Sequence, residues 1–198
     1  MELSVYEQFA QLEENHFWFK GRRTIFFDLI GRSVTMQSEA ADRQILEIGC
    51  GAGGMLGPLS KFGHVTGIDI SHEYMQFCKQ RGHDRVVTGS GYELPFQDNS
   101  FDMVALFDVI EHIPDDQKVL EEVRRVLKPG GQVFISVPAY QFLFSQNDRV
   151  AHHLRRYTAG QLNAVLAKAG LRSKKTTYFN TFLFPLILPA VMVLKIKE

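Results

Sequence analysis

Residues 46–54 read LEIGCGAGG, a glycine-rich turn that directly follows an apolar stretch. Two spacings fit this turn: G-x-G-x-x-G through Gly49, Gly51 and Gly54, and G-x-G-x-G ending instead at Gly53. The first spacing is typical of dinucleotide-binding turns. Glycines at such a turn let the backbone approach a ligand at the N-terminus of the following helix. The turn therefore predicts a small-molecule site and leaves the class of the ligand open.

The composition is that of a globular protein. Of the 198 residues, 45% are hydrophobic and 22% charged, which favours a single domain over residues 1–198. The 22 basic residues are balanced by 22 acidic ones, so no nucleic-acid partner is expected. Cys50 and Cys78 form no C-x-x-C pair, which predicts neither a disulfide framework nor a structural zinc site and favours a cytoplasmic location. The acidic first residues lack a long apolar run, so we expect no signal peptide.

Short apolar runs alternate with helical patterns along the chain. The runs have the character of buried parallel strands and cover residues 43–48, 64–68, 85–87, 103–107 and 132–137. One helix is predicted to begin near Asp116 and to stop at Pro129-Gly130, and another to open with Thr158 and Gln161 as a capping box and to close at Gly170. This alternation predicts a Rossmann-like, doubly wound, mostly parallel α/β sheet, with the ligand beyond the carboxyl ends of the strands.

Asp69 follows the second predicted strand, 20 residues after Gly49. A carboxylate at this distance accepts hydrogen bonds from ribose hydroxyls. The alternative is that Asp69 caps the next helix, but Ser71 can fill that role as well. Glycine turn and acid together predict a ligand that carries a ribose.

Glu47 lies two residues before the glycine turn. A carboxylate there repels a pyrophosphate and suits a ligand with a cationic end. The chain also holds only one glycine-rich strand–helix unit, whereas a nicotinamide dehydrogenase usually needs two mononucleotide halves. An NAD-dependent oxidoreductase is therefore the disfavoured alternative.

Five stretches follow one another in the order LEIGCGAGG, VTGIDIS, LPFQDNSFDMV, FDVIEHI and LKPGGQVFISVP. Together they resemble class I S-adenosylmethionine-dependent methyltransferases, over roughly residues 43–171. The resemblance implies one methyltransferase domain with a helical lid over residues 1–42, a cofactor-binding core over 43–140, and a substrate-side loop, last helix, strand and apolar tail over 141–198. It also implies that S-adenosylmethionine is the cofactor.

The resemblance also implies roles for single residues. The glycines of the turn, with Cys50 as a small side chain among them, form a wall against the amino-acid and ribose portions of the cofactor. Glu47 holds its ammonium group, and Asp69 binds the ribose hydroxyls. Where the family commonly has an acid that meets the adenine, this chain has Ser90. The cofactor-binding residues expected in this way are Glu47, Gly49, Cys50, Gly51, Gly53, Asp69, Ile70, Ser90, Gly91, Tyr92, Asp108, Val109 and His112.

The acceptor side is expected in NDRVAHHLRRYTAGQL, residues 147–162. Methyl transfer is an in-line displacement that needs no metal, and a hydroxyl acceptor gains from a general base. We expect His153 to be this base, Arg156 to bind an anionic acceptor, and Tyr140 and Tyr157 to line the pocket. The alternative is a solvated basic surface. The fragments HxRRYT and HFWFKGRR resemble methyltransferases of lipid or surface-polysaccharide pathways, so we expect a small acceptor of that class, methylated at oxygen.

The N-terminal stretch completes the expected site. Arg22 shares a helical face with Phe26, which predicts that it points inward and pairs with the methionine carboxylate of the cofactor. His16, Phe17 and Trp18 are expected to form an aromatic lid over the acceptor, the alternative being that Phe17, Trp18 and Phe19 cover the edge of the sheet. A non-catalytic cofactor-binding subunit remains the second alternative to an enzyme.

The C-terminal part carries two expectations. Residues 171–180 are expected to form a strand, with residues 190–198 as a possible partner. Residues 182–194 are apolar but interrupted by two prolines, and they are too short to span a bilayer, which needs about 20 residues. We expect this segment to be buried, or to rest on a membrane surface.

Overall fold

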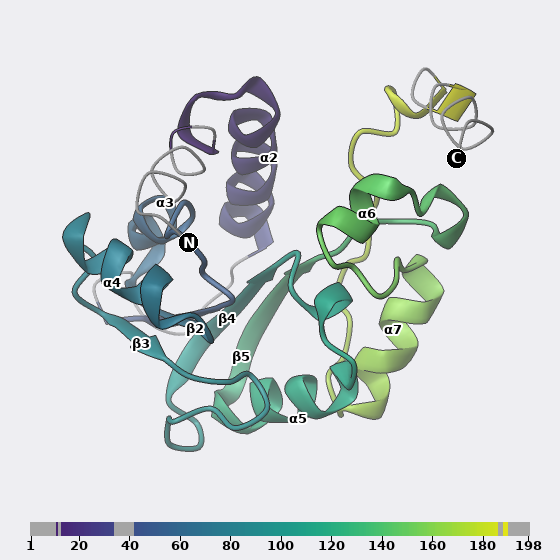
Figure 1. Ribbon diagram of the computed structural model, residues 1–198. Helices are drawn as coiled ribbons and strands as arrows, with labels where there is room; N and C mark the ends of the chain where they lie inside the picture. Colours follow the sequence, from purple (N-terminus) through teal and green to yellow (C-terminus); the bar gives the residue numbers. More distant parts are fainter. Residues whose placement is uncertain (1–10, 12, 34–41, 186–187, 190–198) are drawn as a thin grey trace. The chain divides into compact units, whose positions relative to one another are not determined.

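A computed structural model describes residues 11, 13–33, 42–185 and 188–189. The chain divides into two compact units (Figure 1). Unit 1 comprises Met1–Phe107 and Arg125–Ile135, and unit 2 comprises Asp108–Arg124 and Ser136–Glu198. Each unit is described by itself.

A five-stranded sheet organises unit 1, in the order β3-β2-β1-β4-β5 (Figure 1). Its strands are β1 (Gln44–Ile48), β2 (His64–Asp69), β3 (Val86–Thr88), β4 (Phe101–Phe107) and β5 (Leu127–Ser136). β1 pairs in parallel with β2 and β4, and β2 pairs in parallel with β3. The register sets Ile48 beside Ile68, so the glycine turn and Asp69 leave the sheet at the same edge. The predicted doubly wound α/β fold is confirmed.

The helices of unit 1 are α2 (Phe17–Ser33), α3 (Leu56–Leu59), the short 3-10 helix η1 (Ser60–Phe62) and α4 (His72–Gln80). α2 packs on the sheet through its apolar face. Phe26 is buried and stacks on Phe107 of β4, with ring centroids 5.7 Å apart, while Ile30 joins a core cluster with Ile45. Much of the expected lid helix is therefore a packing helix of the core.

The elements that begin in unit 2 are η2 (Ile110–His112), α5 (Asp116–Val126), η3 (Gln141–Leu143), α6 (Gln146–Val150) and α7 (Ala159–Lys168). The predicted caps of α7 are confirmed. The Thr158 hydroxyl accepts from the backbone N–H of Gln161, whose side chain accepts from Thr158 in return. Gly170 follows the helix with φ of 75°, a conformation that glycine adopts at no steric cost.

The predicted boundary between α5 and β5 is wrong. The helix ends at Val126 instead of Pro129, and β5 begins at Leu127 instead of residue 132. The carbonyls of Arg125 and Val126 accept hydrogen bonds from the backbone of Asn99 and Ser100, at 3.0 and 2.8 Å. These carbonyls are therefore bonded to residues outside the helix, and the chain is already extended at Leu127, before Pro129.

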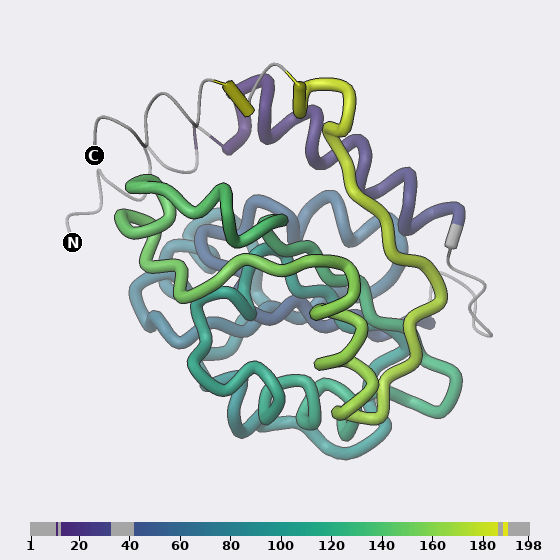
Figure 2. Tube along the Cα trace, turned by 90° about the vertical axis from the view of Figure 1, so that its right-hand side faces the viewer, coloured from purple at the N-terminus to yellow at the C-terminus, as the bar shows by residue number. Residues whose placement is uncertain are grey.

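The strand predicted over residues 171–180 is also wrong, since the structure has no strand there. Figure 2 shows this segment as an extended trace that follows α7. Its side chains bond to the helix, with the Thr176 hydroxyl donating to Oδ1 of Asn163 at 2.8 Å and the Tyr178 hydroxyl accepting from Ala159 N at 2.9 Å. The expected partner strand over residues 190–198 lies outside the described residues. Among the helices that the structure describes, none is long and apolar enough to cross a membrane. Only residues 182–185 and 188–189 of the apolar segment 182–194 are described.

Candidate active site

The glycine turn of unit 1 resolves the ambiguity of its spacing. Gly49, Gly51 and Gly53 have φ of 71°, 50° and 83°, in the left-handed region, whereas Gly54 is not among the glycines with positive φ. A Cβ on Gly53 would also lie 3.0 Å from Sγ of Cys78. The three glycines required by backbone conformation are therefore those of the G-x-G-x-G spacing.

Asp69 braces this turn from the end of β2. Its Oδ2 accepts a hydrogen bond from the backbone N–H of Gly51 at 2.9 Å, and its Oδ1 accepts from Ser71 N at 2.9 Å. The cap of α4 is Ser71, whose hydroxyl accepts from Tyr74 N. The alternative role of Asp69 as the helix cap is thus filled by Ser71. Each carboxylate oxygen can accept more than one hydrogen bond, so these contacts are compatible with ribose binding.

Glu47 has a buried carboxyl, and its Oε2 has no hydrogen-bond partner among the described residues. Burial raises the pKa of Glu47 well above its ordinary value, and the negative potential of Cys78, Glu13 and Asp69 raises it further. A buried carboxyl without a donor is costly unless a ligand supplies one. The site is therefore suited to a cationic group and hostile to a pyrophosphate.

Glu13 is a member of this acidic site that sequence reasoning missed. Its carboxyl lies against the turn, where a Cβ on Gly54 would clash with Oε2. Burial raises the pKa of Glu13, and Arg23, Arg81 and Arg22 partly oppose the effect. The sequence offers only an acidic run before an aromatic helix, with no spacing that ties it to the glycine turn.

Arg22 lies on the same helix as predicted and stacks on Phe26, its guanidinium carbon 5.1 Å from the ring centroid. Its charge also acts on Glu13. Pairing of Arg22 with the methionine carboxylate of a cofactor stays a prediction.

The other expected cofactor residues of unit 1 differ in what surrounds them. Ile70 is 78% exposed beside Asp69, as a side chain that covers a flat ring would be. The Ser90 hydroxyl accepts from Tyr92 N at 3.2 Å and so closes its own turn, which leaves Ser90, Gly91 and Tyr92 as predictions. Cys50 is buried, and its Sγ would lie 2.8 Å from a Cβ on Gly67, so it fills space.

Asp108 and Val109 belong to unit 2. Asp108 has φ of 54°, which aspartate tolerates better than most residues. Its backbone N–H donates to Ser136 O at 3.0 Å, and its Oδ1 accepts from the Ser136 hydroxyl at 2.9 Å. The expected role of Asp108 and Val109 on the methionine side of the cofactor stays a prediction.

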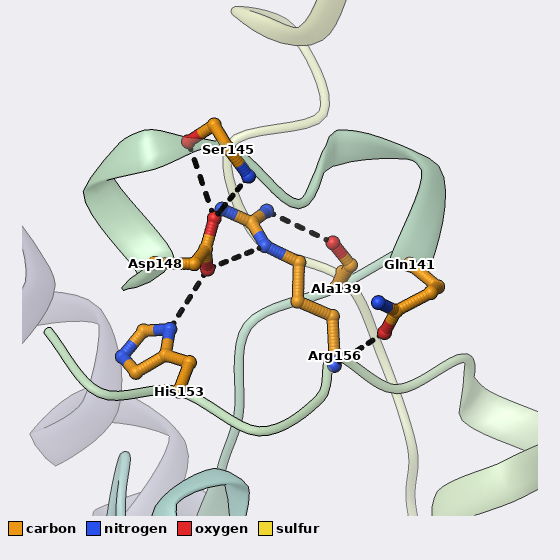
Figure 3. Close-up of polar contacts among 6 residues, drawn as sticks. All are labelled: Ala139, Gln141, Ser145, Asp148, His153 and Arg156. Carbon is orange, nitrogen blue, oxygen red and sulfur yellow. Dashed lines mark hydrogen bonds and ion pairs between the residues drawn. The ribbon is translucent and has the colours of Figure 1, made fainter. Parts of the chain in front are cut away.

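His153, the expected base, is held by a buried carboxylate (Figure 3). Its Nδ1 donates to Oδ1 of Asp148 at 2.8 Å, and the Asp148 side chain is 1% exposed. Arg156 donates to both oxygens of the same carboxylate, from Nε at 2.8 Å and from Nη2 at 2.9 Å. Burial raises the pKa of Asp148, but the hydrogen bonds from Arg156, His153 and the Ser145 backbone outweigh it and bring that pKa to about 2.

Two further side chains lie against His153. The ring of His112 meets it edge-on, with centroids 4.7 Å apart and planes at 79°. Although the His112 side chain is exposed, partial desolvation lowers its pKa, and the nearby His153 lowers it further. Glu111 is fully buried, and its backbone carbonyl accepts from Leu154 N at 2.8 Å. The segment around η2 is thus tied to the segment that carries His153.

Arg156 and Tyr157, expected to bind the acceptor, have structural tasks within unit 2. Arg156 also donates to Ala139 O, at 3.2 Å (Figure 3). Tyr157 is 4% exposed, and its hydroxyl donates to Oδ2 of Asp116 at 2.6 Å. Burial and this hydrogen bond raise the pKa of Tyr157. Acceptor binding by either residue stays a prediction, and both make hydrogen bonds within the protein without it.

The aromatic residues expected at the acceptor are divided between the units. In unit 2, Tyr140 stacks on Tyr178 with centroids 5.0 Å apart and planes at 12°. In unit 1, Phe17 is 77% exposed and so does not cover the sheet, whereas Trp18 is 37% exposed. The ring centroid of His16 lies 4.6 Å from that of Phe17. A common acceptor pocket of these residues stays a prediction.

Comparison with known proteins decides the family. A methyltransferase-domain family matches residues 46–135, the part of the chain that carries the glycine turn, Glu47, Asp69 and β5. Residues 46–135 form a methyltransferase domain, and this part of the chain is similar to class I S-adenosylmethionine-dependent methyltransferases. S-adenosylmethionine is the cofactor of this family, and the oxidoreductase alternative is set aside.

Three relatives show what this methyltransferase is similar to. An uncharacterised protein of Methanocaldococcus jannaschii is 34% identical over 140 residues, which cover 68% of this chain and 62% of the relative. A demethylmenaquinone methyltransferase of Staphylococcus aureus is 41% identical over 96 residues, 44% of this chain and 40% of the relative. A phosphoethanolamine N-methyltransferase of Haemonchus contortus, solved with phosphomonomethylethanolamine and S-adenosylhomocysteine, has a TM-score of 0.64 at 27% identity, covering 82% of this chain and 41% of that one. The chain thus spans about 40–62% of the length of these relatives.

Proposed function

We propose that the chain is an S-adenosylmethionine-dependent methyltransferase that acts on a hydroxyl oxygen of a small acceptor, linked to a lipid or a saccharide. The observation that carries the cofactor part of the proposal is the buried carboxyl of Glu47, whose Oε2 has no hydrogen-bond partner among the described residues, beside the left-handed glycines and Asp69. The observation that carries the proposal of an oxygen acceptor is the hydrogen bond between His153 and Asp148.

The site residues of unit 1 have separate tasks in cofactor binding. Glu47 would accept from the ammonium group, which supplies the donor that its buried Oε2 lacks. Asp69 would accept from the ribose hydroxyls while it holds the turn through Gly51 N. Glu13 adds negative potential that favours a cationic ligand. When bound, S-adenosylmethionine supplies a methyl group on a positively charged sulfur.

His153 would act on the acceptor. Because its Nδ1 donates to Asp148, the neutral imidazole presents the lone pair of Nε2, which can take the proton of an acceptor hydroxyl. A base held by a third group in this way is the arrangement that activates weak oxygen nucleophiles. An amine acceptor would need no such orientation, so the pair favours oxygen.

The class of acceptor rests on similarity. The names of two relatives specify small acceptors, demethylmenaquinone in one and phosphoethanolamine in the other. The fragments HxRRYT and HFWFKGRR, which include His153 and Trp18, favour lipid- or saccharide-linked compounds. Tyr140, stacked on Tyr178, offers an aromatic surface for an apolar part of such an acceptor.

The proposal is tested with S-adenosylmethionine labelled in the methyl group and a panel of phenolic, quinol, lipid-linked and saccharide hydroxyl acceptors. We expect transfer of the label to oxygen, identified by mass spectrometry. His153→Ala should lower turnover by about 10²-fold or more while the Kd for S-adenosylhomocysteine stays the same. His152→Asn is the matched control, because His152 is exposed with φ of 59°, which asparagine tolerates, and it should retain full turnover.

Three results would contradict the proposal in different ways. Label found only on nitrogen would exclude the oxygen acceptor. Normal turnover of His153→Ala would remove this residue from the reaction. Tight binding of S-adenosylhomocysteine without transfer to any acceptor, in any preparation, would favour the alternative of a non-catalytic cofactor-binding subunit.

A further inference from the structure

We propose that Glu111, His112 and His153 form a binding site for a divalent transition-metal ion in unit 2. Each of the three side chains offers one ligand atom, and these atoms all lie within 4.8 Å of one another. Three ligands of one ion, each about 2.0–2.2 Å from it in tetrahedral or trigonal geometry, are about 3.3–3.8 Å apart. On binding, the three side chains would rotate toward the ion to close the remaining distance.

The chemistry of the three ligands selects the class of ion. Two imidazoles and one carboxylate suit Zn²⁺, Mn²⁺ or Fe²⁺, whereas Ca²⁺ and Mg²⁺ prefer sites made of oxygen alone. The carboxyl of Glu111 is fully buried, which distinguishes this cluster from the exposed acidic groups that occur on any protein surface. His112 is exposed and His153 is partly buried, so the cluster lies at the surface of unit 2, where an ion can enter.

Contacts behind His153 have the form of the outer shell of a metal site. Histidine ligands almost always donate their second ring nitrogen to a carboxylate, a carbonyl or a water, which fixes the ring and makes the ligating nitrogen more basic. Nδ1 of His153 makes this bond to the buried Asp148 (Figure 3). Asp148 is itself fixed by Arg156 and by the backbone of Ser145, so the direction of Nε2 is set before any ion binds.

The backbone also holds the two halves of the cluster together. Glu111 and His112 lie in η2, and the Glu111 carbonyl accepts from Leu154 N, the residue after His153, at 2.8 Å. His152 adopts φ of 59°, and residues held in this sparsely populated region are concentrated at functional sites. The ligands thus come from two segments, with His112 and His153 41 positions apart in the sequence, that are fixed to each other within one unit.

The use of this ion in methyl transfer rests on the proposed function, and it changes the role of His153 from a base to a metal ligand. A nitrogen that coordinates an ion cannot take a proton with the same lone pair. With an ion bound, His153 would be a ligand; the ion would act as a Lewis acid on the acceptor hydroxyl, and the proton would pass to solvent water. The sequence predicted no metal because methyl transfer needs none, and the three ligands become neighbours only in the folded unit.

The test measures metal binding by the protein alone, without cofactor or acceptor. The metal-free full chain is dialysed against Zn²⁺ or Mn²⁺, the bound ion is quantified, and Co²⁺ is added separately to record the visible absorption of the bound ion. We expect one ion per chain. His112→Ala and His153→Ala should each weaken binding at least tenfold, and Asp148→Asn about 10- to 100-fold, as outer-shell changes do. His152→Asn, the matched control, should bind like the unaltered chain.

Several outcomes separate this inference from the proposed function. Absence of a stoichiometric ion at millimolar metal, or unaltered binding in both His112→Ala and His153→Ala, would overturn the metal site even if S-adenosylhomocysteine still binds. His112 is exposed, so we expect His112→Ala to fold, and thermal unfolding verifies this. Glu111 is left unaltered because its side chain is fully buried. One bound ion in a chain that fails to bind S-adenosylhomocysteine would support the metal site and refute the proposed function.

Discussion

Replacement of Asp69 by alanine removes one carboxylate that serves the protein and the cofactor at once. In the structure it accepts from Gly51 N and Ser71 N, each at 2.9 Å. Hydrogen bonds to a charged group contribute about 1.5–3 kcal/mol each, and Asp69 is only partly buried, so we take the lower value for both. Asp69→Ala should therefore destabilise the chain by about 3 kcal/mol. The loss of the ribose hydrogen bonds should weaken S-adenosylhomocysteine binding at least tenfold, about 1.4 kcal/mol.

The assay combines calorimetric titration of S-adenosylhomocysteine with thermal unfolding. A chain of this size should lose about 2–4 °C in Tm per kcal/mol. Ser71→Ala is the matched control, because it removes the hydroxyl that caps α4 and leaves the Asp69 carboxylate in place. This control should lower the free energy of unfolding by about 1 kcal/mol and leave cofactor affinity unchanged.

Two results would refute this reasoning. A folded Asp69→Ala chain with an unaltered Kd would mean that the carboxylate only braces the turn. A Ser71→Ala chain that loses as much affinity as Asp69→Ala would mean that cofactor binding follows the stability of α4 and not the carboxylate.

Three other changes test separate parts of the structure. Because burial raises the pKa of Glu47 above its ordinary value of 4.5, the folded chain binds this proton more tightly than the unfolded chain, and stability falls as pH rises from about 4.5 through the raised pKa. Glu47→Gln should remove that part of the fall in denaturant titrations at several pH values and weaken S-adenosylhomocysteine binding; an unchanged pH profile would show that Glu47 is not buried as a protonated acid. Gly51→Ala should lower the free energy of unfolding by about 1–2 kcal/mol, because alanine is strained in the left-handed backbone conformation of this position. Gly53→Ala should lower it more, because its Cβ would also lie 3.0 Å from Sγ of Cys78, whereas a Cβ on Gly51 meets nothing within 4 Å. Equal losses of the two variants in chemical unfolding would contradict this order. Tyr157→Phe should lower stability by about 1.5 kcal/mol through loss of the bond to Asp116 and leave turnover intact, whereas a selective loss of turnover would restore Tyr157 to the acceptor site.

Local patterns in the sequence predicted the fold and the core of the cofactor site. Parallel strands buried on both faces read as continuous apolar runs, so the positions of β1, β2 and β4 follow from composition alone. The glycine turn and Asp69 follow adjacent strands, and the register of β1 with β2 places them at one edge. These predictions depend on neighbours in sequence or on a general rule of α/β sheets.

The predictions that failed depend on partners far away in the sequence. The end of α5 is decided by Asn99 and Ser100, which take the carbonyls of its last turn. The absence of a strand over residues 171–180 follows from side-chain bonds to α7. Glu13 joins the acidic site only because its side chain lies against Gly54 in the folded unit.

Asp148 shows what the sequence held in part. A serine three residues before an acid, at the start of a short helix, indicates a capping box, and Ser145 and Asp148 form one. The same carboxylate binds His153 and Arg156, five and eight residues further on, and no helical or strand period links those positions. The capping box has a sequence pattern, whereas no sequence pattern indicates that its carboxylate also orients His153.

Titration of the unaltered chain with S-adenosylhomocysteine and, separately, with NAD⁺ tests the central claim most directly. The acidic site formed by Glu47, Glu13 and Asp69 should accept the ammonium-bearing nucleoside and repel the pyrophosphate. We predict saturable binding of one S-adenosylhomocysteine per chain, displaced by S-adenosylmethionine, and no heat of binding with NAD⁺. Saturable binding of NAD⁺ together with no binding of S-adenosylhomocysteine would contradict the account.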